Sequence, residues 1–291
     1  MLNDLNFALY DERPSKELFH YTSIDSLLGI VKDKTLWATE LKYLNDSQEF
    51  RYFAELMREK TLVYDASGNE AEIDATNQLR SWIRDWFVDG ALVFTTSFTQ
   101  KGNVLSQWRG YCEHGKGVSL GFDPAAIIGC ADQASFKLGR CIYDWERHDS
   151  LATEVVKRLV KAAVENGPDA TKHVSQCYYN TFDAAATDII QIAVLTKHPA
   201  FVEEEEWRCV SQPVKNYVEA PIEYRSGRAS LIPFIRFPLP VINDALAIQT
   251  AIVGPSPSPE LAFNGIARFL GKYARTGQQL RIVACQIPYR A

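Results

Sequence analysis

Four consecutive glutamates lie at the centre of an otherwise apolar segment, FVEEEEWRCV at residues 201–210. A solvated acidic run does not normally carry a tryptophan and two valines at its edges. The segment predicts a strand over 203–210, in which alternate side chains point to opposite faces, so that Glu204, Glu206 and Arg208 share one face. Both faces begin and end with apolar residues, which indicates a strand inside a sheet. The central carboxylates must therefore meet water in a cleft or a cationic partner.

The acidic run has two interpretations that the sequence leaves open. One is a structural network in which Glu206 pairs with Arg208 and with an arginine of a neighbouring strand, because strands carry such ladders of opposite charge. The other is a functional cleft in which the carboxylates contact a ligand.

The overall composition is that of an ordinary globular protein. Of the 291 residues, 46% are hydrophobic and 23% are charged, which argues against disorder. The net charge of −5 gives no electrostatic footprint for nonspecific nucleic-acid binding, although a local basic groove stays possible. The N-terminus lacks the basic region of a signal peptide, no apolar stretch reaches the length of a membrane span, and the six cysteines are dispersed. We expect a soluble cytoplasmic protein with reduced thiols and no membrane partner.

Hydrophobic periodicity predicts a single α+β domain over residues 1–291, with a mixed or antiparallel sheet flanked by helices and a helical insertion at about 146–197. Strands are expected at 18–23, 35–39, 91–98, 115–123, 136–144, 203–210 and in four later runs. After the first strand, Thr22 and Asp25 resemble a capping box for a helix. The apolar face of that helix is expected to contain Ile24, Leu27, Leu28 and Val31.

Several catalytic motifs are absent or incomplete. The segment GYCEHGKGVS matches P-loop spacing at Gly110, Gly115 and Lys116, but Gly117 replaces the magnesium-binding hydroxyl. The context is also reversed, because this turn leaves a helix and enters a strand, so we exclude nucleotide hydrolysis through a P-loop. The five histidines show no metal-ligand spacing, and no GxSxG or protease-like cysteine is present, so no metal cofactor is predicted.

Landmarks along the chain resemble an uncharacterised bacterial family, the domain of unknown function 2971 (DUF2971). They are the opening LFHYTSIDSLLGIVKDKTLWATELKYLNDSQEF, then TTSFT, SQWRGYCEHGKGVSLGFD, KHPAFVEEEEWR, IVGPSP and a closing QIPYR. The resemblance spans about residues 18–290. The family name implies no activity.

A second resemblance does imply an activity. A histidine in the first strand, a Thr/Ser-rich second strand and a later Glu-x-Glu strand are similar to ADP-ribosyltransferases, and HYTSIDSLLGIVKDKTL resembles the start of DNA-targeting bacterial ADP-ribosyltransferase toxins. The resemblance implies NAD as the substrate and an ADP-ribosyltransferase-like fold, in a protein of the toxin or phage-defence effector kind. Cleavage of the nicotinamide–ribose bond builds positive charge on the sugar, which a nearby ionised carboxylate stabilises.

The resemblance assigns roles to seven residues. His20 would contact the NAD ribose and Tyr21 would help to frame it. Ser97 would support the catalytic glutamate, and Trp108 or Tyr111 would flank nicotinamide. Glu206 would be catalytic, with Glu204 aiding an acceptor that is a protein or a nucleic acid. The chain departs from the arginine-modifying pattern, with His20 where arginine is expected and TTS in place of STS, which leaves the acceptor open.

Each of these residues also has a simpler structural interpretation. His20 suits a half-buried histidine bonded to the backbone, Ser97 an edge hydroxyl, and Trp108 with Tyr111 the core side of a helix. Asn45 and Asp46 are expected to cap the helix that follows, although their loop could also contact a substrate.

The sequence therefore leaves three alternative functions. They are an NAD-using transferase, a non-catalytic module that binds a nucleotide, nucleic acid or protein, and a metal-assisted hydrolase or nuclease. The transferase requires His20, Ser97 and Glu206 to converge on one cleft with aromatic walls. The hydrolase requires two carboxylates, from 203–206 or from Asp46 and Glu49, at open coordination positions.

Overall fold

The computed structural model describes the chain apart from residues 45–46, 90–91, 113–115, 215, 228, 275–279 and 288–291, and apart from the side chains of residues 47–50 and 86–89. Within these limits the fold is a mixed sheet flanked by helices, as the periodicity predicts.

Strands and helices alternate irregularly along the chain. The strands are β1 (Leu18–Ser23), β2 (Thr35–Glu40), β3 (Phe94–Thr99), β4 (Gly117–Phe122), β5 (Phe136–Arg140), β6 (Glu206–Ser211), β7 (Glu223–Ser226), β8 (Leu231–Pro238), β9 (Val241–Ile242), β10 (Ala245–Leu246), β11 (Thr250–Val253) and β12 (Arg281–Ala284). The α-helices are α1 (Asn3–Tyr10), α2 (Ile24–Asp33), α3 (Ser47–Leu62), α4 (Glu70–Asp89), α5 (Leu105–Tyr111), α6 (Pro124–Gln133), α7 (Trp145–Asn166), α8 (Tyr179–Ala193) and α9 (Pro259–Tyr273). The short 3-10 turns are η1 (Leu41–Tyr43), η2 (Val174–Gln176) and η3 (Pro199–Glu204).

The main sheet branches at β3. Its strand order is β12-β11-β4-β1-β3-β2-β8-β7, while β6 pairs with β3 and β5 pairs with β6. β3 pairs with β6 from Thr95 to Thr99, but it meets β1 at the single register pair Phe19↔Thr99. It meets β2 near the other end, at Thr39↔Thr95 and Glu40↔Phe94. β1 and β2 therefore diverge from β3 along most of their length, and this divergence creates the space for the site.

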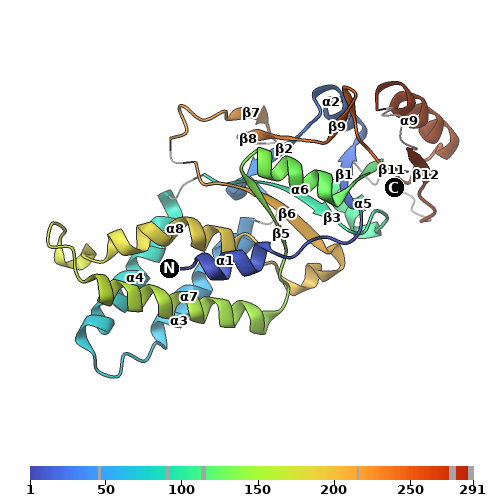
Figure 1. The fold of residues 1–291 in the computed structure, drawn as a ribbon. Helices are drawn as coiled ribbons and strands as arrows, with labels where there is room; N and C mark the ends of the chain where they lie inside the picture. Colours follow the sequence, from blue (N-terminus) through green and yellow to red (C-terminus); the bar gives the residue numbers. More distant parts are fainter. Residues whose placement is uncertain are drawn as a thin grey trace.

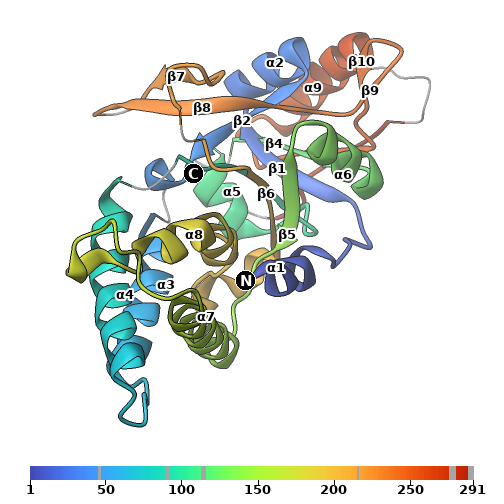
Figure 2. The ribbon, with the colours of Figure 1, turned by 60° about the vertical axis from the view of Figure 1, so that its left-hand side comes forward.

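Helices cover the sheet in separate groups. α3, α4, α7 and α8 gather on one side, where Figures 1 and 2 show them as a bundle, and they enclose a core of their own. α2, α6 and α9 contribute Leu27, Ile127 and Leu270 to a second core together with the sheet. α5 packs on the opposite face of β1, where Trp108 meets Phe19 and Tyr21. No helix among the described residues has the length and apolar character needed to cross a membrane.

Most expected elements are confirmed, and the helical insertion appears as α7, η2 and α8 between β5 and β6. The capping box is wrong by one residue, because the side chain of Ser23 accepts a hydrogen bond from the Ser26 amide and is the N-cap of α2. The expected apolar face of α2 is also partly wrong. Ile24 and Leu28 are exposed, while Ile30 lies with Leu27 and Val31 against the core.

The strand expected over 203–210 begins later than predicted. Residues 199–204 form η3, and Glu205 adopts a left-handed conformation with φ of 42° before β6 begins at Glu206. His198 caps this turn, since its side chain accepts from the Ala200 amide. Within β6 the prediction of a strand inside the sheet is correct, because all six residues are buried between β3 and β5.

The contact between β1 and β4 depends on a glycine. A Cβ added at Gly117 would lie 2.2 Å from the carbonyl oxygen of Thr22 and 2.7 Å from Cys112 Sγ. We expect Gly117→Ala to lower the free energy of unfolding by about 1–3 kcal/mol, because the backbone of β1 must shift to relieve the overlap. Urea denaturation measures this change.

Gly129→Ala in α6 is the matched control. A Cβ at Gly129 meets no described atom within 4 Å, and alanine favours a helix interior by about 1 kcal/mol over glycine. Equal effects of the two substitutions would contradict the close β1–β4 approach.

Candidate functional site

A cavity lies where β1 and β2 diverge from β3, with α5 and the start of β6 at its edges; we call it cavity 1. Its volume of about 250 Å³ lies just below the range of small-molecule sites. The lining residues come from distant parts of the chain and are Phe19, His20, Tyr21, Trp37, Thr39, Leu44, Thr95, Thr96, Ser97, Phe98, Thr99, Gln107, Tyr111, Glu204, Glu206 and Arg225. Six of the seven residues expected at the site therefore lie along one cavity.

His20 bridges the gap between β1 and β3. Its Nδ1 lies 3.0 Å from the carbonyl oxygen of Ser97, and its ring meets Phe98 edge-on at 5.9 Å. Burial lowers the pKa of His20 and outweighs the opposing effect of the Ser97 hydrogen bond, so the ring is neutral at neutral pH. Because a carbonyl oxygen only accepts, Nδ1 carries the proton and Nε2 is an acceptor. The expected backbone-bonded histidine is present, and it also lines the cavity.

Tyr21 is a clamp for the segment between β3 and α5. Its hydroxyl donates to the Lys101 carbonyl at 2.8 Å and accepts from the Val104 amide at 2.9 Å. Trp108 lies behind it, edge-to-face at a centroid distance of 4.7 Å. Trp108 is fully buried and does not line cavity 1, so the structure places it in the core and not beside a ligand. Tyr111, the other candidate, is 39% exposed and lines the cavity.

Hydrogen bonds fix η3 against β3 and α5. Thr99 Oγ1 donates to the Glu204 carbonyl and Ser106 Oγ donates to the Glu203 carboxylate, each at 2.5 Å. Lys101 Nζ lies 3.1 Å from the Glu205 carboxylate. The left-handed Glu205 turns the chain between Glu204 and β6. As a result, Glu204 and Glu206 reach the same cation although they lie in different elements.

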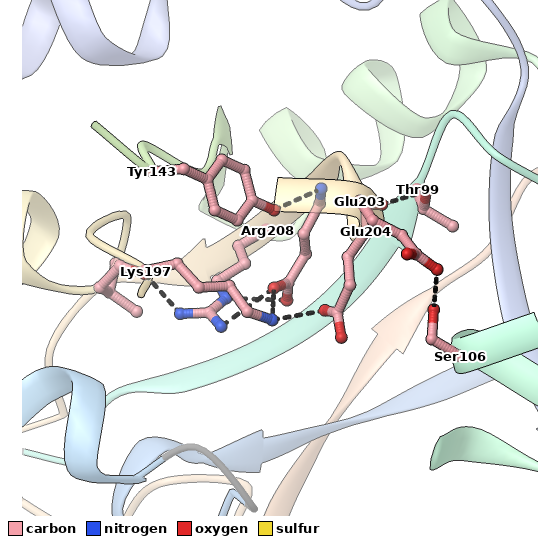
Figure 3. Close-up of polar contacts among 9 residues, drawn as sticks. Thr99, Ser106, Tyr143, Lys197, Glu203, Glu204 and Arg208 are labelled. Atoms are coloured by element: carbon pink, nitrogen blue, oxygen red, sulfur yellow. Dashed lines mark hydrogen bonds and ion pairs between the residues drawn. The ribbon is translucent and has the colours of Figure 1, made fainter. Parts of the chain in front are cut away.

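That cation is Lys197, which together with Glu204, Glu206 and Arg208 forms what we call the charge cluster. Lys197 Nζ lies 2.6 Å from Glu204 Oε2 and 2.6 Å from Glu206 Oε2. Arg208 contacts Glu206 through Nε at 2.8 Å and through Nη2 at 3.1 Å, a bidentate pair. Figure 3 shows Lys197 and Arg208 beside one another, with Glu204 on the far side of the Lys197 ammonium group.

Further contacts hold the cluster in place. Arg208 Nη1 donates to the Val194 carbonyl at 2.8 Å, the Tyr143 hydroxyl accepts from the Glu206 amide at 2.9 Å, and Lys197 lies over the Phe201 ring at 5.1 Å. The network interpretation is confirmed for Glu206 and Arg208. The prediction that an arginine of a neighbouring strand is the second partner of Glu206 is wrong, because Lys197 occupies that position.

The cluster keeps both central groups ionised. Burial raises the pKa of Glu206, but Arg208 and Lys197 together lower it further, to about 2. Burial likewise lowers the pKa of Lys197, and the attraction of Glu206 outweighs it, so that the pKa lies above its ordinary value. Two cations and two carboxylates balance within the cluster, and the Glu204 and Glu206 side chains lie at the wall of cavity 1.

A second cavity, cavity 2, adjoins the first. Its volume is about 390 Å³, and it lies against α2 and β2, where Asp25, Asp33 and Leu36 line it. Four residues line both cavities: His20, Trp37, Thr39 and Arg225.

Among the described residues, no group of three or more His, Cys, Asp or Glu could hold a metal ion. The metal-assisted hydrolase requires only two carboxylates at open positions, so it stays a prediction. Asn45, Asp46 and His114, with the side chain of Glu49, lie outside the described residues.

Three cavity or cluster residues were missed by the sequence reasoning. For Lys197 a signal exists, because it follows the apolar run IIQIAVLT and precedes the acidic run by six residues, so that charge alone suggests their pairing. Trp37 and Arg225 lie in short strands whose position relative to β1 depends on the order of the sheet. No local signal predicts their place at the cavity.

Comparison with known families finds one match. A family model described as a protein of unknown function (DUF2971) matches residues 107–209. The match runs from α5 to β6 and includes the whole charge cluster and Tyr111. The DUF2971 resemblance is confirmed over this segment, about a third of the chain. No curated protein and no solved structure matches the chain.

Lys197→Met tests the charge cluster. The substitution leaves two carboxylates at a buried position with one cation fewer, so we expect the free energy of unfolding to fall by about 3–5 kcal/mol. Chemical denaturation at neutral pH measures it. Lys161→Met, at an exposed lysine of α7 that lies 3.7 Å from Glu165, is the control and should change stability by less than about 0.5 kcal/mol. Similar effects at both sites would argue against a structural role for the cluster.

The pH dependence of stability gives a separate test. The pKa of Glu206 falls from 4.5 in its ordinary state to about 2 in the folded chain, so its stabilising contribution is full above pH 4.5 and is lost as the pH falls toward 2. By linkage this contribution is on the order of 3 kcal/mol. We expect the stability difference between the wild type and Glu206→Gln to narrow from pH 6 to pH 3. A difference that stays constant over this window would show that the cluster does not lower the pKa of Glu206.

Proposed function

We propose that the protein is an NAD-consuming enzyme of the ADP-ribosyltransferase type. One observation carries the proposal: His20 from β1, Ser97 from β3 and Glu206 from β6 line a single cavity that also has aromatic walls at Trp37 and Tyr111. These segments are far apart in sequence. Their convergence is the arrangement that the resemblance requires.

The chemistry assigned to these residues is consistent with their contacts. Nε2 of His20 is an acceptor, which suits a ribose hydroxyl as donor. The exposed ring of Tyr111 suits the flat face of nicotinamide. Glu206 is a fixed, ionised carboxylate, which suits stabilisation of positive charge that develops on the ribose.

In the proposed reaction the bond between the ribose C1′ and the nicotinamide nitrogen breaks, and its electron pair leaves with nicotinamide. A nucleophilic acceptor then bonds to C1′ and loses a proton to solvent or to a nearby base. Glu204 is the member of the charge cluster with the more exposed carboxylate, at 12% against 6% for Glu206, and it lines cavity 1. It is therefore the carboxylate better placed for that proton.

A specific observation favours a second candidate, a non-catalytic nucleotide-binding module. Both carboxylate oxygens of Glu206 already contact Arg208, and one of them also contacts Lys197. Such a carboxylate could serve only to build the wall of the cavity. The two candidates differ in whether Glu206 affects turnover beyond its effect on folding.

Nicotinamide release separates these candidates. The purified protein is incubated with NAD and a bacterial lysate, and released nicotinamide is quantified by chromatography. We expect release by the wild type and a decrease of about 10²–10³-fold in Glu206→Gln, because a charge-stabilising group in the transition state is lost.

Glu203→Gln is the matched control from the same acidic run, since the Glu203 carboxylate contacts Ser106 and not the cluster. Glu204→Gln provides a second variant, and cooperative thermal unfolding shows whether each protein is folded. Absence of nicotinamide release by the folded wild type would contradict the transferase. Nicotinamide release by folded Glu206→Gln at the wild-type level would show that Glu206 has no catalytic role.

A further inference from the structure

Arg225 occupies the boundary between cavity 1 and cavity 2. It lies on β7, the strand at one end of the sheet, and its side chain lines both cavities. Its guanidinium carbon lies 5.7 Å from the centre of the Trp37 ring, which also lines both. The ring is held in turn by Phe234 at 4.7 Å. The aromatic contact limits where the guanidinium group can point.

The guanidinium group has hydrogen-bonding capacity that the described residues do not use. Arg225 Nε is buried and has no hydrogen-bond partner among them, and no ion pair within that part of the chain includes Arg225. The neighbouring strand offers a contrast, because Arg236 on β8 pairs with both Glu223 and Asp33. A buried donor without a partner costs free energy. Arg225 therefore has the properties of a group that a ligand completes.

Charges elsewhere in the cavities restrict which part of a ligand Arg225 can bind. Carboxylates line both cavities, with Glu204 and Glu206 in cavity 1 and Asp25 and Asp33 in cavity 2. Lys197 and Arg208 already balance the first two and Arg236 pairs with Asp33, so Arg225 is the cation of the cavity walls that has no ion pair among the described residues. The arrangement fits a ligand whose negative charge meets Arg225 and whose hydroxyl groups donate to the carboxylates on either side.

We propose that Arg225 binds the diphosphate group of a dinucleotide-like ligand whose two nucleoside halves occupy cavity 1 and cavity 2. This inference rests on the proposed function, because it places the nicotinamide riboside half of NAD in cavity 1. The planar guanidinium group matches phosphate oxygens in a bidentate manner. Trp37, 48% exposed beside it, offers a ring face to the ligand.

Calorimetric titration of the full chain with ADP-ribose tests the proposal. ADP-ribose carries the diphosphate but no nicotinamide, so its binding does not depend on turnover. We expect Arg225→Gln to weaken ADP-ribose binding at least tenfold, equivalent to about 1.4 kcal/mol, and to leave adenosine binding unchanged. The ADP-ribose affinity of Arg225→Lys should lie between those of the wild type and Arg225→Gln, since lysine keeps the charge and loses the bidentate geometry.

Arg281→Gln is the control, because Arg281 lies on β12 at the opposite end of the sheet and is exposed. Equal ADP-ribose affinity in Arg225→Gln and the wild type, or no binding by the wild type, would overturn the proposal. Inorganic pyrophosphate that binds as tightly as ADP-ribose would overturn the two-cavity placement, because the nucleoside halves would add nothing.

The outcomes for the two proposals are distinguishable. Arg225-dependent ADP-ribose binding without nicotinamide release from NAD would support the assignment of Arg225 and contradict the transferase. Nicotinamide release with an unchanged KM for NAD in Arg225→Gln would support the transferase and contradict the assignment of Arg225.

Discussion

The carboxylate of Glu206 lies between two cations inside the sheet, and much of the local structure depends on this contact. Removing a carboxylate, a lysine and an arginine from water is costly unless each finds close partners. Arg208 supplies a bidentate contact from the same strand, and Lys197 supplies the other from the end of the helical insertion. The cluster thus fixes the segment after α8 to β6. This connection brings Glu204 and Glu206 to the wall of cavity 1.

Divergence of the strands around β3 provides the space beside the cluster. β1 meets β3 at one end and β2 meets it at the other, so the strands separate between these points. His20 spans part of the gap through its contact with the Ser97 carbonyl. Tyr21, supported by Trp108, fixes the segment that leads into α5. As a result, the wall of cavity 1 contains a neutral histidine, an ionised carboxylate and exposed aromatic rings.

The sequence predicted the strands and helices that have a clear apolar period, such as β1, β4 and α7. It did not indicate α6, and it placed the acidic run wholly in a strand, because η3 depends on the His198 cap and on the left-handed Glu205. Local patterns singled out His20 and the glutamates, and the resemblance added Ser97 and Tyr111; all of them except Glu203 and Glu205 line cavity 1. Local patterns could not identify Trp37 or Arg225, whose position depends on the long-range pairing of β2 with β8 and of β8 with β7. Trp108 was placed at the site by resemblance, and the packing of α5 against Tyr21 puts it in the core.

The most direct test of the account is a crystal structure of Glu206→Gln with bound NAD. The account predicts electron density for nicotinamide riboside in cavity 1, with a ribose hydroxyl within hydrogen-bond distance of His20 Nε2. It also predicts that the diphosphate contacts Arg225 and that adenosine occupies cavity 2. Density for NAD outside these cavities, or with the diphosphate beside the charge cluster, would contradict the account.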